Sequence, residues 1–285
     1  SPVTATTYPN TDIKPERTKA WEVGLQSHLW NDKLELNVSL YKTSTYNQLF
    51  NPSISASSGY SSIYINGGQV DNKGIEASLT INQPLGPVQW NSTFTYTINR
   101  NKIKKLLKPT TLSNGEVVKQ DMMDLGGLEI VNSRLFEGGS IGDLYVTALR
   151  TDSHGYIDVD YVNNTVAIDN KAGERQDGWI YAGNSQAKYM MGWRNSFSWK
   201  GLTLGCLVNA RIGGIVVSQT QAMMDAYGVS TATAEARDLG YVLIDGYKVP
   251  AVQKYYSTVG SGVGSMYVYS ATNVRLAELS LGYNI

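Results

Sequence analysis

The chain of 285 residues carries 24 Lys and Arg against 24 Asp and Glu, so its net charge gives no indication of a nucleic-acid or anionic-surface partner. Charged residues make up only 17%, whereas Tyr occurs 19 times and Gly 28 times, which is typical of amphipathic β-structure rather than a helical enzyme. A single cysteine, Cys206, excludes an internal disulfide and a cysteine-cluster metal site.

The first part of the chain predicts four long β-strands, because polar and apolar residues alternate and successive side chains of a strand face opposite sides. The predicted strands are residues 18–30, 33–46, 69–82 and 88–99. Asn31 and Asp32 predict a tight turn between the first two strands, and the sequence PLGP at residues 84–87 predicts one between the last two. A polar, serine-rich connection, residues 47–68, separates the pairs.

The clearest alternation lies in residues 88–99, where one face is apolar and is interrupted only by Ser92. The apolar members are Val88, Trp90, Phe94, Tyr96 and Ile98. A strand of about eleven residues, when tilted, is long enough to cross a bilayer. A wall with lipid on one side and water on the other is the simplest cause of this pattern.

The second part of the chain begins with a long connection, residues 100–187, in which residues 141–150 and 155–166 predict short strands. Three further long strands are predicted at residues 188–200, 202–211 and 270–285, with Gly201 at the turn between the first two. A second long connection runs from Gly213 to about residue 269. It contains a predicted helix, residues 218–227, that ends at Gly228.

The connections between the seven long strands alternate between short and long. Bacterial outer-membrane barrels have this asymmetry, with short periplasmic turns and long extracellular loops. A connection as long as residues 100–187 is hard to place in a compact soluble domain. Aromatic residues near the predicted strand ends would form the girdles at the two membrane interfaces. These residues are Trp21, Trp30, Tyr41, Trp90, Trp193, Trp199 and Tyr283.

A soluble β-sandwich is the alternative, because its strands also alternate between a core face and a wet face. Ordinary strands average only five or six residues, however. The length of the strands, the asymmetry of the connections and the placement of the aromatic residues favour the membrane barrel. The predicted fold class is therefore all-β, an antiparallel transmembrane β-barrel.

Several segments resemble the C-terminal half of the barrel in the SusC/RagA family of TonB-dependent outer-membrane transporters of Bacteroidota. The matching blocks are residues 12–25 (DIKPERTKAWEVGL), 59–75 (GYSSIYINGGQVDNKGI), 137–145 (EGGSIGDLY), 183–193 (GNSQAKYMMGW), 210–228 (ARIGGIVVSQTQAMMDAYG) and 270–283 (SATNVRLAELSLGY). They follow the family's order across nearly the whole chain, so together they are specific although no single block is.

The resemblance implies that residues 1–285 are part of a 22-stranded barrel whose plug, first strands and closing strands are absent from this chain. The irregular lead-in at residues 1–17 and the strand pattern that continues to Ile285 agree with a chain cut from something larger. The implied protein imports oligosaccharides or peptides across the Gram-negative outer membrane. Its implied partners are a SusD-like surface lipoprotein and the TonB complex, and neither a cofactor nor enzymatic activity is expected. The alternative is a secreted or surface β-sandwich that binds carbohydrate or acts as an adhesin.

No catalytic, cofactor-binding or metal site has the required spacing. Cys206 lies between apolar residues and is expected to be a small hydrophobic side chain. His28 and His154 are far apart and lack the HExxH spacing. Residues 152–160 loosely resemble a calcium loop but lack its ligand order and terminal Glu, so a turn is expected. The glycines at residues 260–264 predict a flexible loop rather than a phosphate cradle.

Two groups of residues are candidates for ligand contact. The loop aromatics Tyr60, Tyr64, Tyr156 and Trp179 could stack on sugar rings or meet the lipoprotein, although packing of the loops together is favoured. The polar residues expected to face the barrel lumen are Glu22, Glu35, Glu76, Arg194 and Arg211. These are expected to hydrogen-bond the plug or neighbouring strands, with a role in selectivity as the alternative. The Asn-x-Ser/Thr sites at Asn37, Asn91 and Asn163 have no meaning in a bacterial outer membrane.

Overall fold

The computed structural model describes residues 7–51, 59–106, 110–111, 115, 117–118, 121–160, 162–163 and 165–284. The start of the predicted lead-in (residues 1–6), part of the serine-rich connection (52–58) and Ile285 therefore lie outside the described residues. The largest feature is an antiparallel sheet in the order β2-β3-β7-β8-β17-β18-β23. Its strands are β2 (Arg17–Leu29), β3 (Leu34–Tyr46), β7 (Gln69–Leu85), β8 (Val88–Lys105), β17 (Tyr189–Trp199), β18 (Leu202–Ile212) and β23 (Asn273–Tyr283). All seven predicted long strands are present.

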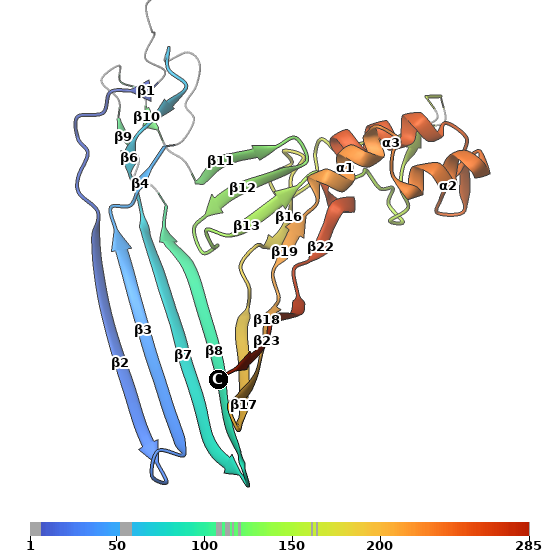
Figure 1. The fold of residues 1–285 in the computed structure, drawn as a ribbon. Helices are drawn as coiled ribbons and strands as arrows, with labels where there is room; N and C mark the ends of the chain where they lie inside the picture. Colours follow the sequence, from blue (N-terminus) through green and yellow to red (C-terminus); the bar gives the residue numbers. More distant parts are fainter. Residues whose placement is uncertain are drawn as a thin grey trace, which may run out of the picture.

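The short turns lie at one end of this sheet and the long connections at the other (Figure 1). The turn from β2 to β3 needs left-handed backbone, and Trp30, Asn31 and Asp32 have φ angles of 54°, 56° and 63°. Lys200 and Gly201, with φ of 45° and 84°, form the turn from β17 to β18 in the same way. The predicted alternation between short and long connections is confirmed.

The register places apolar residues opposite one another, so that one face of the sheet carries a broad apolar band. One row runs Leu36, Leu79, Phe94, Trp193, Val208 and Leu276. Trp193 is 50% exposed and Leu276 is 61% exposed. Across the described residues no second sheet packs on this face, so the two-layer core that a β-sandwich requires is not formed.

The aromatic residues divide between the two faces and the two ends. Trp199 and Tyr283 share the last row beside the Gly201 turn, as a girdle requires. Two expectations were wrong. Trp193 lies in the middle of β17, and Tyr41 lies on the polar face, opposite Glu22 and Gly74. A Cβ on Gly74 would overlap the Tyr41 ring, so this glycine makes room for the tyrosine.

The connection between β8 and β17 contains a four-stranded antiparallel sheet, of which only part was predicted. Its strands, in spatial order, are β11 (Met122–Leu128), β12 (Val131–Phe136), β13 (Asp143–Val146) and β16 (Ile180–Asn184). The turn between β12 and β13 hydrogen-bonds to the loop end of β8. Gly138 N donates to Ile103 O (2.8 Å), and Ile103 N donates to Gly139 O (2.9 Å). A buried cluster of Phe50, Val70, Ile103, Leu106, Met123 and Leu135 holds the two sheets together.

The predicted strand at residues 155–166 is instead a hairpin of β14 (Val159–Asp160) and β15 (Thr165–Val166). Asp160 Oδ1 accepts hydrogen bonds from the backbone N–H groups of Val162 and Asn163 (3.0 and 2.9 Å). An Asp that bonds its own following backbone makes a turn, and this turn interrupts the strand. The predicted strand at residues 141–150 is shorter, and only β13 forms within it.

Short strand pairs complete the β-structure at the loop end. The pairs are β1 (Thr7–Tyr8) with β5 (Ser62–Ile63), β4 (Leu49–Phe50) with β6 (Ile65–Asn66), β9 (Thr110–Thr111) with β10 (Val117–Val118), β19 (Ile215–Val217) with β22 (Val268–Ser270), and β20 (Val242–Ile244) with β21 (Tyr247–Val249). The β1–β5 pair is parallel and the others are antiparallel.

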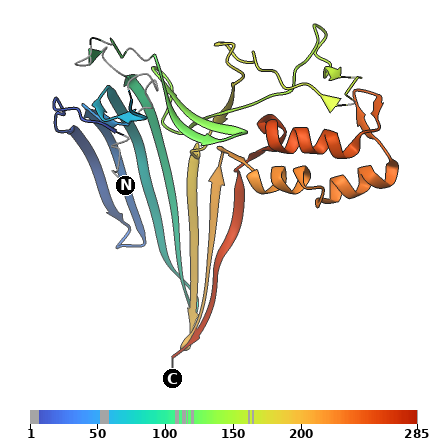
Figure 2. The same cartoon turned by 90° about the horizontal axis from the view of Figure 1, so that it is seen from above.

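The connection between β18 and β23 folds into a helical lobe, residues 218–267, which stands beside the loop ends of these strands (Figures 1 and 2). It contains α1 (Gln219–Ala226), α2 (Thr231–Leu239), α3 (Val252–Gly262) and the 3₁₀ helix η2 (Gly264–Tyr267). The predicted helix at residues 218–227 is confirmed, with Ser218 Oγ capping the N–H of Gln221 (3.2 Å). Helices α2 and α3 were not predicted. Among the helices of the described residues, none is long and apolar enough to cross a membrane.

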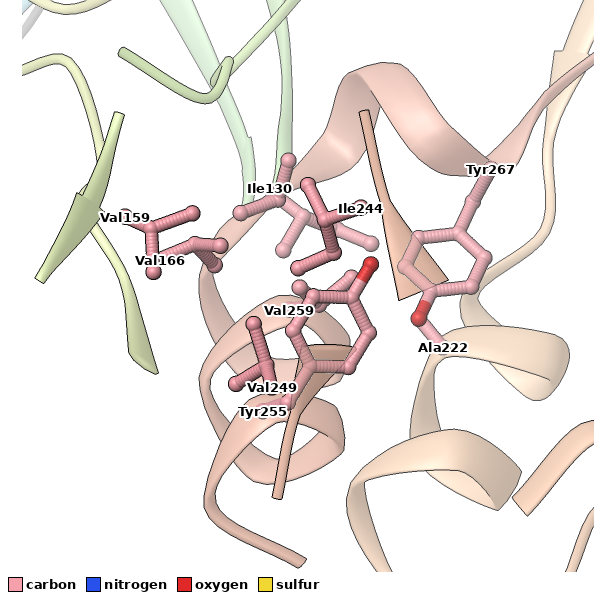
Figure 3. Close-up of a cluster of buried hydrophobic side chains, with 10 residues drawn as sticks. Ile130, Val159, Val166, Ala222, Ile244, Val249, Tyr255, Val259 and Tyr267 are labelled. Atoms are coloured by element: carbon pink, nitrogen blue, oxygen red, sulfur yellow. The ribbon is translucent and has the colours of Figure 1, made fainter. Parts of the chain in front are cut away.

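The prediction of a flexible loop at residues 260–264 was wrong, because these residues lie in α3 and at the start of η2 and are packed. Gly260 lies in α3 against α1, where a Cβ would overlap Ala222 O and Ala226 N. A Cβ on Gly264 would likewise overlap Ile130 O. The glycines therefore serve close backbone approach rather than flexibility. Around them, Tyr255, Val259 and Tyr267 pack on Ala222 and Ile130 in a buried cluster (Figure 3).

Candidate functional site

A cavity of about 950 Å³ opens at the loop end, between the top of β8, the four-stranded sheet and the segment 173–179. Its size lies within the range of about 300–1,000 Å³ that ligand sites occupy. The aromatic lining residues are Phe136, Tyr145, Trp179 and Tyr181. The charged lining residues are Lys102, Arg134, Glu137, Asp143, Glu174, Arg175 and Asp177. The lining therefore combines aromatic faces with charges of both signs.

The register of the four-stranded sheet brings the aromatic side chains together. Tyr145 on β13 lies opposite Tyr181 on β16, and opposed residues share a face. The Tyr145 ring lies 5.5 Å from the Tyr181 ring and 5.4 Å from the Phe136 ring, measured between centroids. These distances are typical of favourable aromatic pairs. The three rings form one wall of the cavity.

Arg134 fixes the segment that covers this wall. Its side chain is only 7% exposed, its Nη1 lies 2.7 Å from Asp177 Oδ2, and its guanidinium lies 5.0 Å from the Trp179 ring centroid. Asp124 Oδ2 lies 3.7 Å from Arg134 Nε, too far for a hydrogen bond, and this buried Nε has no hydrogen-bond partner. One arginine therefore joins β12 to the segment that carries Trp179.

Asp143 is a buried carboxylate in the cavity wall whose oxygens are already engaged. Oδ1 accepts from Asn184 Nδ2 (2.8 Å) and from the Tyr181 hydroxyl (3.3 Å), and Oδ2 accepts from Ser140 N (2.7 Å). Burial raises the pKa of Tyr145 and Tyr181, and the Asp143 charge raises each pKa further. Both hydroxyls therefore stay protonated at neutral pH. The Tyr181 hydroxyl donates its hydrogen to Asp143, which leaves the Tyr145 hydroxyl as the donor for a ligand.

The four predicted loop aromatics do not gather at one place. Only Trp179 lines the cavity. Tyr60 packs edge-on against Tyr8, with 5.2 Å between ring centroids, while Tyr64 and Tyr156 are 43% and 58% exposed. The sequence reasoning missed Arg134, Phe136, Tyr145 and Tyr181. The alternation in VNSRLF could have shown that Arg134 and Phe136 share a sheet face. Nothing in the sequence indicates that this strand lies near those that carry Tyr145 and Tyr181.

The five predicted lumen-facing residues all lie on the polar face of the seven-stranded sheet. Arg194 Nη2 lies 3.1 Å from Glu278 Oε2, Arg211 Nη2 donates to Ser185 O (2.6 Å), and Glu35 accepts from Asn37 Nδ2 (2.9 Å). Glu22 accepts from Ser39 on the neighbouring strand. Glu22 and Glu76 also line a second hollow, of about 590 Å³, on this face. Hydrogen bonding to neighbouring chain segments thus accounts for Glu22, Arg194 and Arg211, whereas Glu35 bonds within its own strand.

The remaining candidates lie apart from the cavity. Cys206 is half-buried on the apolar face, opposite Asn195 and Leu279. His28 pairs with Asp32 (3.1 Å) at the short-turn end, whereas His154 lies in the long connection. Within the described residues, no group of three or more His, Cys, Asp or Glu side chains could hold a metal ion.

The calcium-loop resemblance resolves into a turn, as expected. Asp152 Oδ1 accepts from the N–H groups of His154 (2.7 Å) and Tyr156 (3.0 Å). The Asn163 side chain, which belongs to one of the Asn-x-Ser/Thr sites, donates to Asp160 Oδ2 (2.7 Å) and lowers the pKa of that carboxyl. The other two sites, Asn37 and Asn91, lie within β3 and β8.

A sheet of long antiparallel strands, apolar on one face and polar on the other, with all long connections at one end, defines the wall of an outer-membrane β-barrel. The family model described as "TonB dependent receptor-like, beta-barrel" matches residues 1–204. The chain belongs to this family. Membership confirms the predicted outer-membrane location and places the chain among receptors rather than enzymes.

Individual relatives agree with this assignment. TonB-dependent receptor P3 of Formosa agariphila is 26% identical over 300 residues, covering 99% of this chain and 28% of that protein. TonB-dependent receptor P26 of the same organism is 23% identical, covering 97% and 28%. The chain thus spans between a quarter and a third of the length of the curated relatives it matches.

Solved structures share the fold. The RagAB peptide transporter superposes with a TM-score of 0.66 at 18% identity, covering 94% of this chain and 29% of that chain. The RagAB peptide importer in its "open-open" state gives 0.64 at 20% identity, covering 98% and 29%. The resemblance to the SusC/RagA family is therefore confirmed at the level of the fold.

Proposed function

We propose that this chain is the wall and part of the extracellular mouth of a TonB-dependent importer, within a barrel of 22 strands. The observation that carries the proposal is the seven-stranded sheet with one exposed apolar face and one polar face. In the complete barrel the apolar face meets lipid and the polar face lines the lumen. Plug, first strands and closing strands are contributed by other parts of the same protein. TonB force on the plug then drives transport.

The proposed cargo is a peptide that passes through the cavity at the mouth. Carboxylates and guanidinium groups in one cavity suit a chain with charges of both signs, and the solved relatives named above are peptide transporters by title. The wall of Tyr145, Tyr181 and Trp179 supports an oligosaccharide as the second candidate, since sugar rings stack on aromatic faces. A SusD-like lipoprotein is the proposed lid over this mouth.

Site-directed spin labelling of the full-length protein in bilayers tests the orientation of the sheet. Labels at Leu79→Cys and Phe94→Cys, in a Cys206→Ser background, are expected to be accessible to lipid-dissolved oxygen. Labels at Thr80→Cys and Thr95→Cys, on the polar face of the same strands, serve as matched controls and are expected to meet aqueous quenchers instead. Equal oxygen accessibility for both pairs would refute the proposal.

A growth experiment tests the cargo. A strain that lacks the gene is expected to lose growth on a peptide source while growth on glycans is retained, and the wild-type gene should restore it. Restoration by a Trp179→Ala, Tyr181→Ala variant to wild-type rates would show that the cavity is not on the transport path. Loss of growth on glycans alone would replace peptide by oligosaccharide as cargo.

A further inference from the structure

Six cationic side chains gather at the loop end of β2, β3, β7 and β8, on the face that is apolar further down the sheet. The register places Lys42 opposite Lys73 and Lys73 opposite Arg100, so these three form one row across adjacent strands. Arg17, Lys19 and Lys102 follow on the same face in the next rows. We call these six residues the basic collar. The zero net charge of the chain conceals this cluster.

The basic collar begins where the apolar band ends. The row directly below it consists of Val23, Leu40, Ile75 and Ile98. Trp21 lies opposite Lys42, in the first row of the collar, and is 55% exposed. Tryptophan favours the boundary between acyl chains and headgroups. The collar therefore lies at headgroup height in the arrangement proposed above.

The charges of the collar are poorly compensated within the protein. Like charges directly opposite each other on a sheet repel. Asp71 lies on the same face, and its Oδ2 is 3.9 Å from Lys42 Nζ. Within the described residues, Lys73 and Lys102 make no ion pair, and Lys73 is exposed. An external anion would relieve the repulsion.

The opposite end of the same face has no such cluster. Its last rows are Leu29 with Leu34 and Trp199 with Leu202 and Tyr283. Lys33 and Lys200 are the nearest cations at that end, and both lie at the short turns rather than in a row across strands. The charge asymmetry matches a bilayer in which only one leaflet carries a strongly anionic headgroup.

We propose that the basic collar binds the phosphate groups of an anionic glycolipid in the outer leaflet of the membrane. Lys42 and Lys73 donate to the phosphate oxygens, and the acyl chains lie along the apolar rows below. Arg100 is partly engaged elsewhere, since its Nη1 donates to Lys188 O (2.8 Å), and it forms the edge of the site. The inference rests on the proposed function, which places the apolar face in lipid and the loop end outside the cell.

Lipid binding by the full-length protein in nanodiscs tests the inference. Nanodiscs of phosphatidylcholine with and without diphosphorylated lipid A are compared, and bound lipid A is counted by native mass spectrometry. Each lysine removed from the collar is expected to weaken binding about fivefold, so Lys42→Gln with Lys73→Gln weakens it about 25-fold. Lys42→Arg with Lys73→Arg is expected to retain binding and shows that charge, not folding, is responsible.

The matched control removes two lysines elsewhere at the loop end, by Lys14→Gln with Lys254→Gln, and is expected to leave lipid A binding unchanged. Equal binding by the collar variant and the wild type would overturn the inference. The spin label at Phe94→Cys separates this failure from that of the proposed function. If the label lies in lipid and the Lys42→Gln, Lys73→Gln variant still binds lipid A as the wild type does, only the collar inference is refuted. If the label is shielded from lipid, both the inference and the proposed function are refuted.

Discussion

The indole N–H of Trp193 donates to Ser92 Oγ over 3.0 Å, across the pair β17–β8 and on the apolar face of the sheet. Trp90 Nε1 likewise donates to Asn195 Oδ1 (3.1 Å), and Asn195 lies directly opposite Ser92 in the register. The one polar interruption in the alternation of residues 88–99 is thus paired with a polar residue and covered by two indoles. Ser92 and Asn195 are only 6% and 5% exposed. A polar group in hydrocarbon must be hydrogen-bonded, and the tryptophans meet that requirement.

Replacing Trp193 by Phe is expected to destabilise the full-length protein by about 1 kcal/mol, because Ser92 Oγ loses its donor on an apolar face. Urea unfolding in detergent, followed by tryptophan fluorescence, measures the change. Ser92→Ala in the Trp193→Phe background should recover most of it, since the unsatisfied hydroxyl is then gone. Strict additivity of the two single changes would show that the pair is not coupled.

Replacing Gly260 by Ala is expected to loosen the helical lobe, because the new methyl group would overlap the α1 backbone at Ala222 and Ala226. Overpacking of this kind costs about 1–3 kcal/mol. Limited proteolysis of the full-length protein should then cleave between residues 218 and 267 sooner than in the wild type. Ser261→Ala, at the exposed neighbouring position of α3, is the control and should leave the cleavage rate unchanged.

The long strands could be predicted from the sequence because each one faces two different solvents along its whole length. Alternation then persists over a dozen residues, and a single interruption such as Ser92 does not obscure it. The register of these strands, which assembles the basic collar, depends on pairing between segments far apart in sequence. Lys42, Lys73 and Arg100 carry no shared local pattern, so neither their row nor its position could be foreseen.

The long connections were harder to predict for a different reason. Their elements are short and packed on several sides, so that neither a period of two nor a helical period develops. In α3 the glycines at 260 and 262 lower helix propensity, and tertiary packing on α1 overrides it. At the cavity, Arg134 and Trp179 meet across the fold, and only the folded chain makes them neighbours.

Replacing Arg134 by Met is expected to release the segment 173–179 from β12, because Asp177 loses its buried partner. The loss is about 2 kcal/mol, less than for a fully buried pair, since Asp124 and Asp177 are each about a third exposed. Hydrogen exchange of the full-length protein should accelerate at residues 173–179 and leave β17 and β18 unchanged. Arg150→Met, which removes an exposed pair with Asp158, is the matched control and should change little. Uniform acceleration across the sheet would contradict a local role.

The helical lobe is expected to lose stability as pH rises above 10, because two of its buried tyrosines must stay neutral. Burial, with a contribution from Tyr256, raises the pKa of Tyr255 to about 12. Burial also raises the pKa of Tyr267, and the hydrogen bond from its hydroxyl to Asp225 Oδ2 (2.9 Å) raises it further.

Above pH 10 the unfolded lobe releases these protons while the folded lobe retains them, so unfolding becomes easier as the pH rises. The stability that Tyr255 contributes is present below pH 10 and is lost toward pH 12. Proteolysis rates of the lobe between pH 8 and about pH 11 measure the effect. Tyr255→Phe should flatten this pH dependence, whereas Tyr247→Phe, at an exposed position, should leave it unchanged. If the pH dependence persists in Tyr255→Phe, another group is responsible for it.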